Sequence, residues 1–166
     1  MFISIKLNHI LSKSYTTKIK LGTFYAYVKE DNDFYKKRHL MKFEICEPFL
    51  GFETLKEVEV QKIDDIFMNM RSSENEKISF TLIDPFVLIE YDFEIPENIK
   101  ELLEIEKESN ILVLNIVLIQ NPIEDSIINF LSPILFNTDS NKAAQIILPE
   151  TSKYGIAEKI SKFLKR

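Results

Sequence analysis

Residues 41–166 contain no histidine, because both histidines of the chain, His9 and His39, lie in the first forty residues. This part of the chain therefore cannot form the Ser-His-acid or Cys-His arrangements that activate many catalytic nucleophiles. The single cysteine, Cys46, lies on an apparent β-strand, and we interpret it as a small core residue rather than a nucleophile. The sequence predicts no catalytic residue and no enzymatic activity.

Patterns that bind metals and nucleotides are missing as well. One cysteine excludes an internal disulfide and paired-cysteine zinc spacing, and neither an H-E-x-x-H pattern nor a D-x-D-x-D-G calcium loop occurs. Three glycines, at positions 22, 51 and 155, cannot form a glycine-rich phosphate loop. We therefore expect neither a metal site nor a cofactor.

The sequence also lacks a long apolar run. Its longest, at residues 111–119, is interrupted by Asn115 and falls short of the roughly 20 residues that a membrane-spanning helix needs. No cleavable signal is evident, and a single unpaired cysteine suits a reducing compartment. We expect a cytoplasmic protein without membrane contact.

Charge is distributed in three blocks. Residues 1–40 hold eight Lys or Arg and three Asp or Glu, a net +5, whereas residues 41–150 hold eight against twenty-two, a net −14. Residues 151–166 hold five against one, a net +4. The acidic body should repel nucleic acid, while the basic ends leave open an alternative, a small β protein that binds nucleic acid through them.

The first forty residues differ from the rest of the chain in composition. Alternation at residues 3–7 and an aromatic run at residues 24–28 are compatible with a pair of strands. Tyrosines interleave with basic residues here, which would suit base stacking. We interpret residues 1–40 instead as a basic extension, structural or dispensable, that precedes a separate domain at residues 41–166.

From Met41 onward, short apolar stretches are separated by turn residues, which is typical of a small antiparallel β-barrel or sandwich. In several of them apolar and polar residues alternate, so each strand should bury one face. The run at residues 111–119 is predicted to lie in the middle of the sheet. Strands are expected at residues 41–46, 57–60, 78–82, 86–95 and 111–119, with more within 126–137 and 143–148.

Two helices are predicted in this mostly β domain. A short internal helix begins at Pro96, since proline suits the first helical position and Glu97 suits the positive end of the helix dipole. The last segment places apolar residues at i, i+4, i+7 and i+8, which predicts a C-terminal amphipathic helix. These apolar residues are Ile156, Ile160, Phe163 and Leu164.

One cluster of carboxylates occurs, at Glu90, Asp92 and Glu94. Alternation along a strand would place all three on one face, at steps of about 7 Å. A glycosidase could use such a pair, but the chain has no tryptophan to stack on a sugar and no supporting motif. Two interpretations stay open, a solvated face and an acidic stripe that docks or repels a partner.

Three motifs occur in order along residues 41–166. Residues 48–53, PFLGFE, place a proline shortly before Gly-Phe-Glu. Residues 80–96, FTLIDPFVLIEYDFEIP, run from aliphatic residues through Asp84-Pro85 into an acidic-aromatic stretch that closes on Ile-Pro. Residues 129–137, NFLSPILFN, join two asparagines through aliphatic residues. Together they resemble the FliW flagellar assembly factor family, in which asparagine is usual at the position of Asp84.

The chain departs from this family at both ends. Many members carry a Tyr-x-x-Arg-His-like motif near the C-terminus, where this chain has Tyr154-Gly155-Ile156-Ala157-Glu158. Residues 1–40 match nothing in the family, which favours Met41 as the biological start of the protein.

The resemblance implies a partner-switching function. Proteins of this kind bind flagellin and the translational repressor CsrA in competition, and FliW freed by flagellin export captures CsrA and relieves repression of flagellin synthesis. The motifs supply the candidate protein-binding residues, which are Phe52, Glu53, Asp84, Pro85, Glu90, Tyr91, Asp92, Glu94, Asn129 and Asn137.

Overall fold

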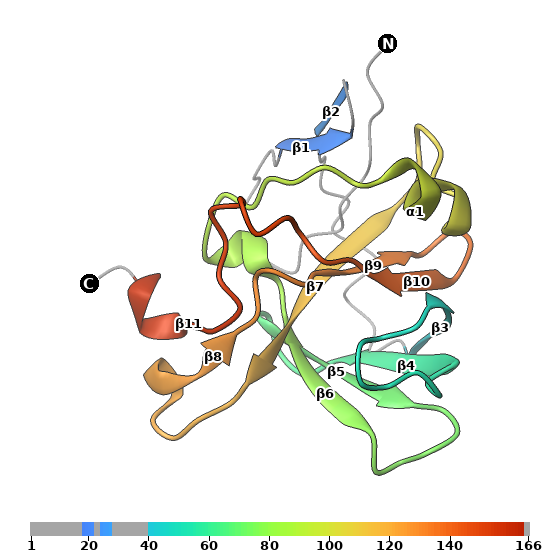
Figure 1. Ribbon diagram of the computed structural model, residues 1–166. Coiled ribbons are helices and arrows are strands. Elements are labelled where there is room, and N and C mark those ends of the chain that lie inside the picture. Colours follow the sequence, from blue (N-terminus) through green and yellow to red (C-terminus); the bar gives the residue numbers. More distant parts are fainter. Residues whose placement is uncertain (1–17, 22–23, 28–39, 165–166) are drawn as a thin grey trace.

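The structure, a computed structural model, describes residues 18–21, 24–27 and 40–164. Its centre is a closed β-barrel in which the strands follow one another around the ring as β7, β6, β5, β4, β3, β10 and β9, and a β9–β7 pairing completes the ring (Figure 1). The prediction of a mostly β fold is confirmed. The ring consists of β3 (Met41–Glu47), β4 (Glu57–Lys62), β5 (Phe67–Ser72), β6 (Ser79–Ile83), β7 (Ile111–Leu118), β9 (Ile134–Asn137) and β10 (Lys142–Gln145).

The prediction of a purely antiparallel barrel is wrong, because β10 pairs with β3 in parallel, with Lys142 beside Glu44. The other pairings around the ring are antiparallel. Strand direction must alternate along antiparallel neighbours, so a ring with an odd number of strands cannot close unless one neighbouring pair is parallel. Seven strands therefore require the β3–β10 pair.

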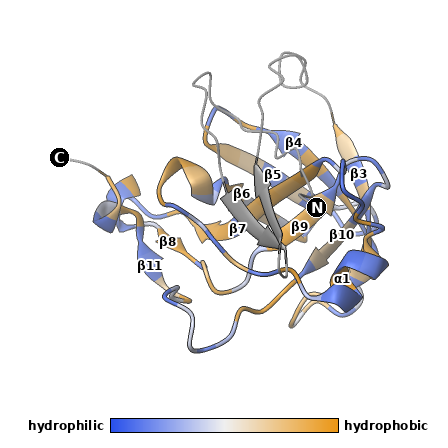
Figure 2. Cartoon of the chain, turned by 90° about the horizontal axis from the view of Figure 1, so that it is seen from above, coloured by the Kyte–Doolittle hydropathy of each residue, from blue (hydrophilic) through white to orange (hydrophobic). Residues whose placement is uncertain are grey.

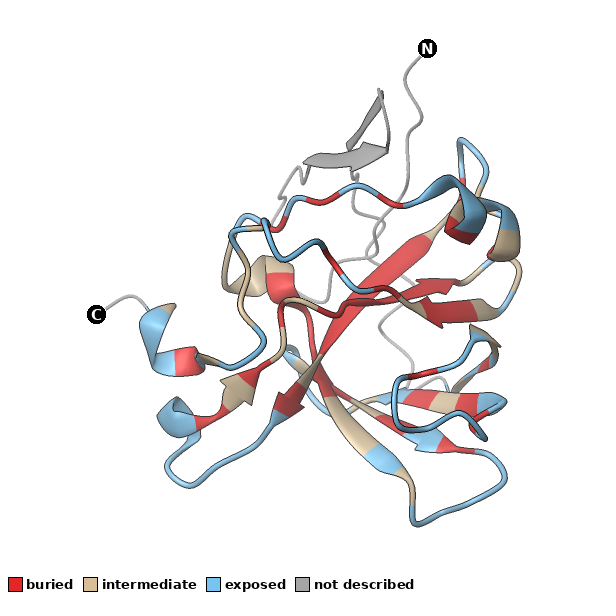
Figure 3. Cartoon of the chain, viewed as in Figure 1, coloured by how far each residue is buried: buried red, intermediate tan, exposed pale blue. Residues whose placement is uncertain are grey.

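Strand β7 is buried on both faces, which explains its nearly continuous apolar sequence. Leu112 and Leu114 point into the barrel, where the core also contains Phe43 and Phe136. The alternate residues, Ile111 and Val113 among them, belong to a second apolar cluster on the outer side of the sheet. Figure 3 shows β7 coloured as buried along most of its length. The predicted central position of this strand is confirmed, since β7 pairs with β6, β8 and β9.

The outer cluster is covered by the long connection between β6 and β7. This connection includes a 3-10 turn, η1 (Pro85–Val87), and the helix α1 (Glu97–Leu102). It contributes Tyr91, Phe93 and Ile95 to the outer cluster. The barrel therefore has an apolar interior and, on one side, a second apolar layer.

The predicted internal helix is confirmed as α1. Pro96 lies at its N-cap, Glu97 opens its first turn, and Ile99 and the C-cap residue Leu103 are buried in the outer cluster. The solvent side of α1 is hydrophilic (Figure 2). The helix thus buries one side against the outer cluster.

The predicted strand at residues 86–95 is wrong, although its alternation is real. After η1 the chain continues to Pro96 without a named strand, yet Tyr91, Phe93 and Ile95 are buried while the residues between them are exposed. The segment packs on the outer side of the sheet through these side chains. Alternation in the sequence indicates which side chains are buried, and it does not require that the segment pair with a neighbouring strand.

The predicted C-terminal amphipathic helix is also wrong for the described residues. Glu158–Lys159 forms a strand, β11, antiparallel to β8 (Ile127–Ile128), and only a 3-10 turn, η3 (Ile160–Lys162), follows. Ile160 is buried, whereas Ile156 and Leu164 are exposed. Strand pairing and burial of Ile160 and Phe163 thus overrode the helical spacing.

The described residues before Leu40 form a separate two-stranded sheet. A predicted strand at residues 24–28 corresponds to β2 (Phe24–Tyr27), which pairs with β1 (Lys18–Leu21), whereas residues 3–7 lie outside the described residues. No helix in the described part of the chain is both long and apolar enough to cross a membrane. A further 3-10 turn, η2 (Ile123–Asp125), precedes β8.

Replacement of Phe136 by alanine tests the barrel interior. This side chain is fully buried and its ring lies 4.9 Å from that of Phe43. We expect Phe136→Ala to lower the free energy of unfolding by about 3–5 kcal/mol, because a cavity replaces the ring. Leu118→Ala, at a position 60% exposed, is the control and should change it by less than about 0.5 kcal/mol. Denaturant titration measures both, and equal losses would contradict the assignment.

Candidate functional site

The turn after β3 carries the first motif. The Phe52 N–H donates to the Phe49 carbonyl at 2.8 Å, and Gly51 has φ of 84°, a backbone conformation that favours glycine. The backbone N–H groups of Glu53 itself and of Gly51 hydrogen-bond the Glu53 carboxylate and lower its pKa. Phe49 is buried, while Phe52 packs edge-on against Phe80 and is still 37% exposed. The turn therefore presents Phe52 and Glu53 at the surface.

Asp84 and Pro85 form a structural corner rather than a binding surface. Both are buried, and the Asp84 carboxylate accepts the N–H of Phe86 at 2.8 Å at the start of η1. Aspartate and asparagine both accept such a bond, so the change from the usual asparagine keeps the cap. The proposed binding role of Asp84 and Pro85 does not fit this burial.

Tyr91 joins the outer segment to β7. Its hydroxyl donates to the Phe130 carbonyl and accepts a bond from the Asn115 amide at 3.3 Å. The same amide donates to the Asn129 carbonyl at 2.7 Å. Burial raises the pKa of Tyr91 well above its usual range. A buried polar network thus holds three segments together, and Tyr91 belongs to the core.

Asn129 and Asn137 also have architectural roles. The Asn129 side chain accepts the N–H of Leu131 at 3.1 Å. The Asn137 amide donates to the carbonyls of Leu103 and Glu104, at 2.8 and 3.2 Å, where α1 ends. Carbonyl groups at a helix end lack partners within the helix, so this buried asparagine supplies one. Asn137 is buried and Asn129 is half-buried, and the side-chain oxygen of Asn129 is used within its own turn.

Three of the four acids of the second motif lie at the surface. Glu90, Asp92 and Glu94 are exposed between buried neighbours, as alternation predicted. Tyr154 fixes the middle of this segment, because its hydroxyl accepts the N–H of Asp92 at 2.6 Å and donates to the Asp92 carbonyl at 2.9 Å. The structure therefore holds an acidic stripe in a defined conformation without burying it.

Leu50 and Glu53 of the first motif and Asp92 and Glu94 of the second border one groove, which we call the acidic-rimmed groove. It consists of two neighbouring hollows of about 470 and about 410 Å³ that share Pro96, Ile146 and Ile147. The turn after β3, the segment 92–99 and the segment 145–149 enclose it. Its apolar lining includes Phe49, Leu50, Phe93, Ile95, Ile99, Ile146, Ile147 and Leu148.

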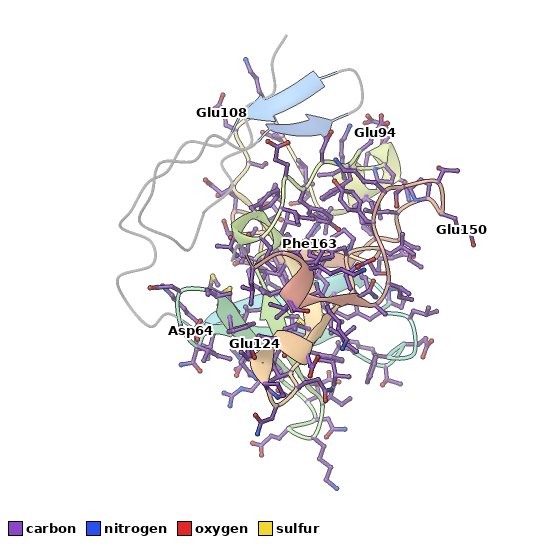
Figure 4. All side chains as sticks on the ribbon, turned by 90° about the vertical axis from the view of Figure 1, so that its left-hand side faces the viewer. Asp64, Glu94, Glu108, Glu124, Glu150 and Phe163 are labelled. Atoms are coloured by element: carbon purple, nitrogen blue, oxygen red, sulfur yellow. The ribbon has the colours of Figure 1, made fainter. Side chains whose placement is uncertain are left out.

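The rim of this groove is acidic. Its carboxylates come from Glu47 and Glu53 in one hollow and from Asp92, Glu94 and Glu97 in the other. Among the described residues that line it there is no lysine or arginine. In Figure 4, Glu94 of this rim lies near one end of the molecule, away from Glu124, an acid that does not line the groove.

Sequence reasoning missed the third wall of the groove. The sequence predicts a strand within residues 143–148 and a motif at residues 48–53, and neither prediction marks Ile147 or Leu50 as an exposed apolar residue. Leu50 is 78% exposed and Ile147 is 63% exposed. Their apolar character does not mark them as exposed, because neighbouring apolar residues, Phe49 beside Leu50 and Ile146 beside Ile147, are buried. Only the folded chain distinguishes them.

A third hollow, of about 290 Å³, lies beside the C-terminal segment and carries both signs of charge. Glu90, Glu158, Lys153 and Lys162 line it, and Lys162 forms an ion pair with Glu158. Lys159 forms another, with Asp125 at 2.8 Å. Pairing with acids reduces the positive potential that the nucleic-acid alternative needs at this end of the chain. Within the described residues, no group of three potential ligands is placed to hold a metal ion.

A model of the FliW protein family matches residues 32–160. This chain belongs to the FliW family. The flagellar assembly factor FliW of Sulfurimonas denitrificans is 62% identical over 126 residues, which span 76% of this chain and all of the relative. FliW 2 of Wolinella succinogenes is 46% identical over 125 residues, 74% of this chain and 92% of the relative.

Two further comparisons agree. FliW of Campylobacter lari is 42% identical over 130 residues, 76% of this chain and 98% of that protein. A crystal structure of the flagellar assembly factor FliW superposes with a TM-score of 0.66 at 21% identity, covering 86% of this chain and 96% of the other, which supports the fold. The resemblance read from the motifs is confirmed, and members of the FliW family are assembly factors rather than enzymes. The domain boundary predicted at Met41 stays a prediction.

Tyr91→Phe tests whether this FliW residue is architectural. Loss of the hydroxyl should lower the free energy of unfolding by about 1–3 kcal/mol near pH 7, because buried partners are left unpaired. Because the pKa of Tyr91 is raised in the folded protein, its contribution to stability also depends on pH. Ionisation of the unfolded tyrosine removes this stability as pH rises above about 10, so the difference between wild type and variant should shrink there.

Denaturant titrations at neutral pH and at about pH 10.5 measure both effects. Glu94→Gln is the control, since Glu94 is exposed and its replacement should change stability by less than about 0.5 kcal/mol. A difference between wild type and Tyr91→Phe that is independent of pH would contradict this reading.

Proposed function

We propose that this FliW family member acts in the cytoplasm as a partner switch that binds flagellin and CsrA in competition. The observation that carries the proposal is family membership, with 62% identity to a flagellar assembly factor over that protein's whole length. While flagellin is abundant inside the cell it occupies the protein. Export of flagellin frees the protein to capture CsrA, and translation of flagellin resumes.

The acidic surface supplies a physical route for antagonism of RNA binding. Residues 41–150 carry twenty-two acids against eight basic residues. Docked beside an RNA-binding face, this negative body repels phosphate over a Debye length of about 8 Å at physiological salt. Direct overlap with the RNA is then unnecessary. Flagellin is held differently, through an apolar surface that receives an amphipathic helix.

The association itself can be tested by titration calorimetry of the purified chain with flagellin and with CsrA. We expect saturable binding of each, and addition of flagellin should displace CsrA. Variants Glu74→Gln and Glu76→Gln, in the exposed turn between β5 and β6, serve as controls that should bind both partners like wild type. Binding of neither partner at low ionic strength would overturn the proposal.

Salt dependence tests the repulsion mechanism separately. CsrA bound to flagellin message should be released by this protein less effectively as salt rises from about 50 to about 200 mM, because screening weakens repulsion of phosphate. A gel-shift titration at each salt concentration measures the release. The affinity of the protein for CsrA without RNA, measured at the same salt concentrations, is the control. Release that is independent of ionic strength after this correction would contradict electrostatic repulsion.

A further inference from the structure

The acidic-rimmed groove has an apolar interior that the fold leaves uncovered. Ile147 and Leu50 project from two of its walls and are 63% and 78% exposed. Beneath them the floor is the packed outer cluster, with Ile146 and Ile99 both buried. Two large aliphatic side chains thus lie on the edges of a concave surface. An apolar side chain of a partner that packs between them would lose much of its contact with water.

The charges around this groove are unbalanced. Of its five carboxylates, Glu97 forms an ion pair, with Lys100. Glu47, Asp92 and Glu94 take part in no ion pair among the described residues, and Glu53 accepts hydrogen bonds from backbone N–H groups. Some acids elsewhere on the barrel are paired, as Glu59 is with Arg71 at 2.7 Å. The groove therefore keeps negative charge that a bound cation would neutralise.

We infer that the acidic-rimmed groove is the docking site for a cationic amphipathic segment of a partner protein, with apolar side chains against Ile147 and Leu50 and lysine or arginine against Asp92, Glu94 and Glu47. Charge complementarity selects this occupant, because an acidic segment would be repelled by the five rim carboxylates, of which only Glu97 is ion-paired among the described residues. Polyanions such as nucleic acid and anionic lipid surfaces are disfavoured for the same reason. The inference deepens the proposed function, on which the choice of flagellin and CsrA as natural partners rests.

Two groove variants and two matched controls separate local docking from general attraction to an acidic protein. The groove charge variant is Glu47→Gln/Asp92→Asn/Glu94→Gln, and its control removes three exposed acids elsewhere, Glu74→Gln/Glu76→Gln/Glu124→Gln. The groove apolar variant is Leu50→Ser/Ile147→Ser. Its control is Ile63→Ser/Leu118→Ser, at positions 57% and 60% exposed. Thermal unfolding checks that all four fold like wild type.

The first probe is a fluorescein-labelled helical peptide built only of leucine and lysine, with its leucines on one face, titrated by fluorescence anisotropy into the full chain. We expect each groove variant to weaken its binding by about tenfold or more, and each control to stay within about twofold of wild type. A matching peptide with glutamate in place of lysine should not bind. Failure of the lysine peptide to bind wild type, or equal weakening by groove and control variants, would overturn the inference.

The second arm titrates the same five proteins with flagellin and with CsrA. If the groove variants, but not the controls, bind one partner more weakly, that partner is the source of the segment and the inference is supported. If the groove variants bind both partners as wild type does, the inference about the groove is overturned and the proposed function stays intact. If wild type binds the lysine peptide through the groove but binds neither flagellin nor CsrA, the proposed function fails and the docking site stands.

Discussion

The fold depends on β7, a strand that has to be buried on both faces. One face of β7 closes the barrel interior with Leu112 and Leu114, and the other carries the outer cluster on which the connection between β6 and β7 packs. Its edges are used as well, because β6 and β9 pair with it and the β9 pairing closes the ring. Asn115 is the polar residue in this strand, and it binds Tyr91 and the Asn129 carbonyl. The polar interruption of an apolar strand thus anchors the outer segment.

The motif residues divide into those that build the loops and those that the loops present. Asp84, Tyr91 and Asn137 are buried and hydrogen-bonded to neighbouring backbone. Unpaired buried polar groups are costly, so these residues determine where the connecting segments run. The exposed residues between them, such as Asp92 and Glu94, are then held in place by segments whose alternate side chains are buried. Rigid support of this kind lets surface loops carry binding without large ordering costs.

The chemistry of the surface is that of association. Asp92 and Glu94 of the second motif are exposed carboxylates beside an apolar groove, and the described residues form no cluster suited to a metal ion. Negative charge gathers where apolar side chains are uncovered, and four of the five rim acids form no ion pair among the described residues. In the proposed switch between two partners, apolar contact would supply affinity and charge would supply selectivity.

Alternation and local helix signals by themselves determined that this chain is mostly β, that residues 111–119 contain a central strand, and that a short helix follows Pro96. The FliW family came separately, from the resemblance of three ordered motifs. Alternation also placed Glu90, Asp92 and Glu94 on one exposed side. Tertiary structure alone decided the parallel β3–β10 pair, which follows from closing an odd ring, and the strand and 3-10 turn in place of a C-terminal helix. It alone brought Leu50, Ile147 and the acids together, because a groove depends on contacts between segments far apart in the chain, which local periodicity does not encode.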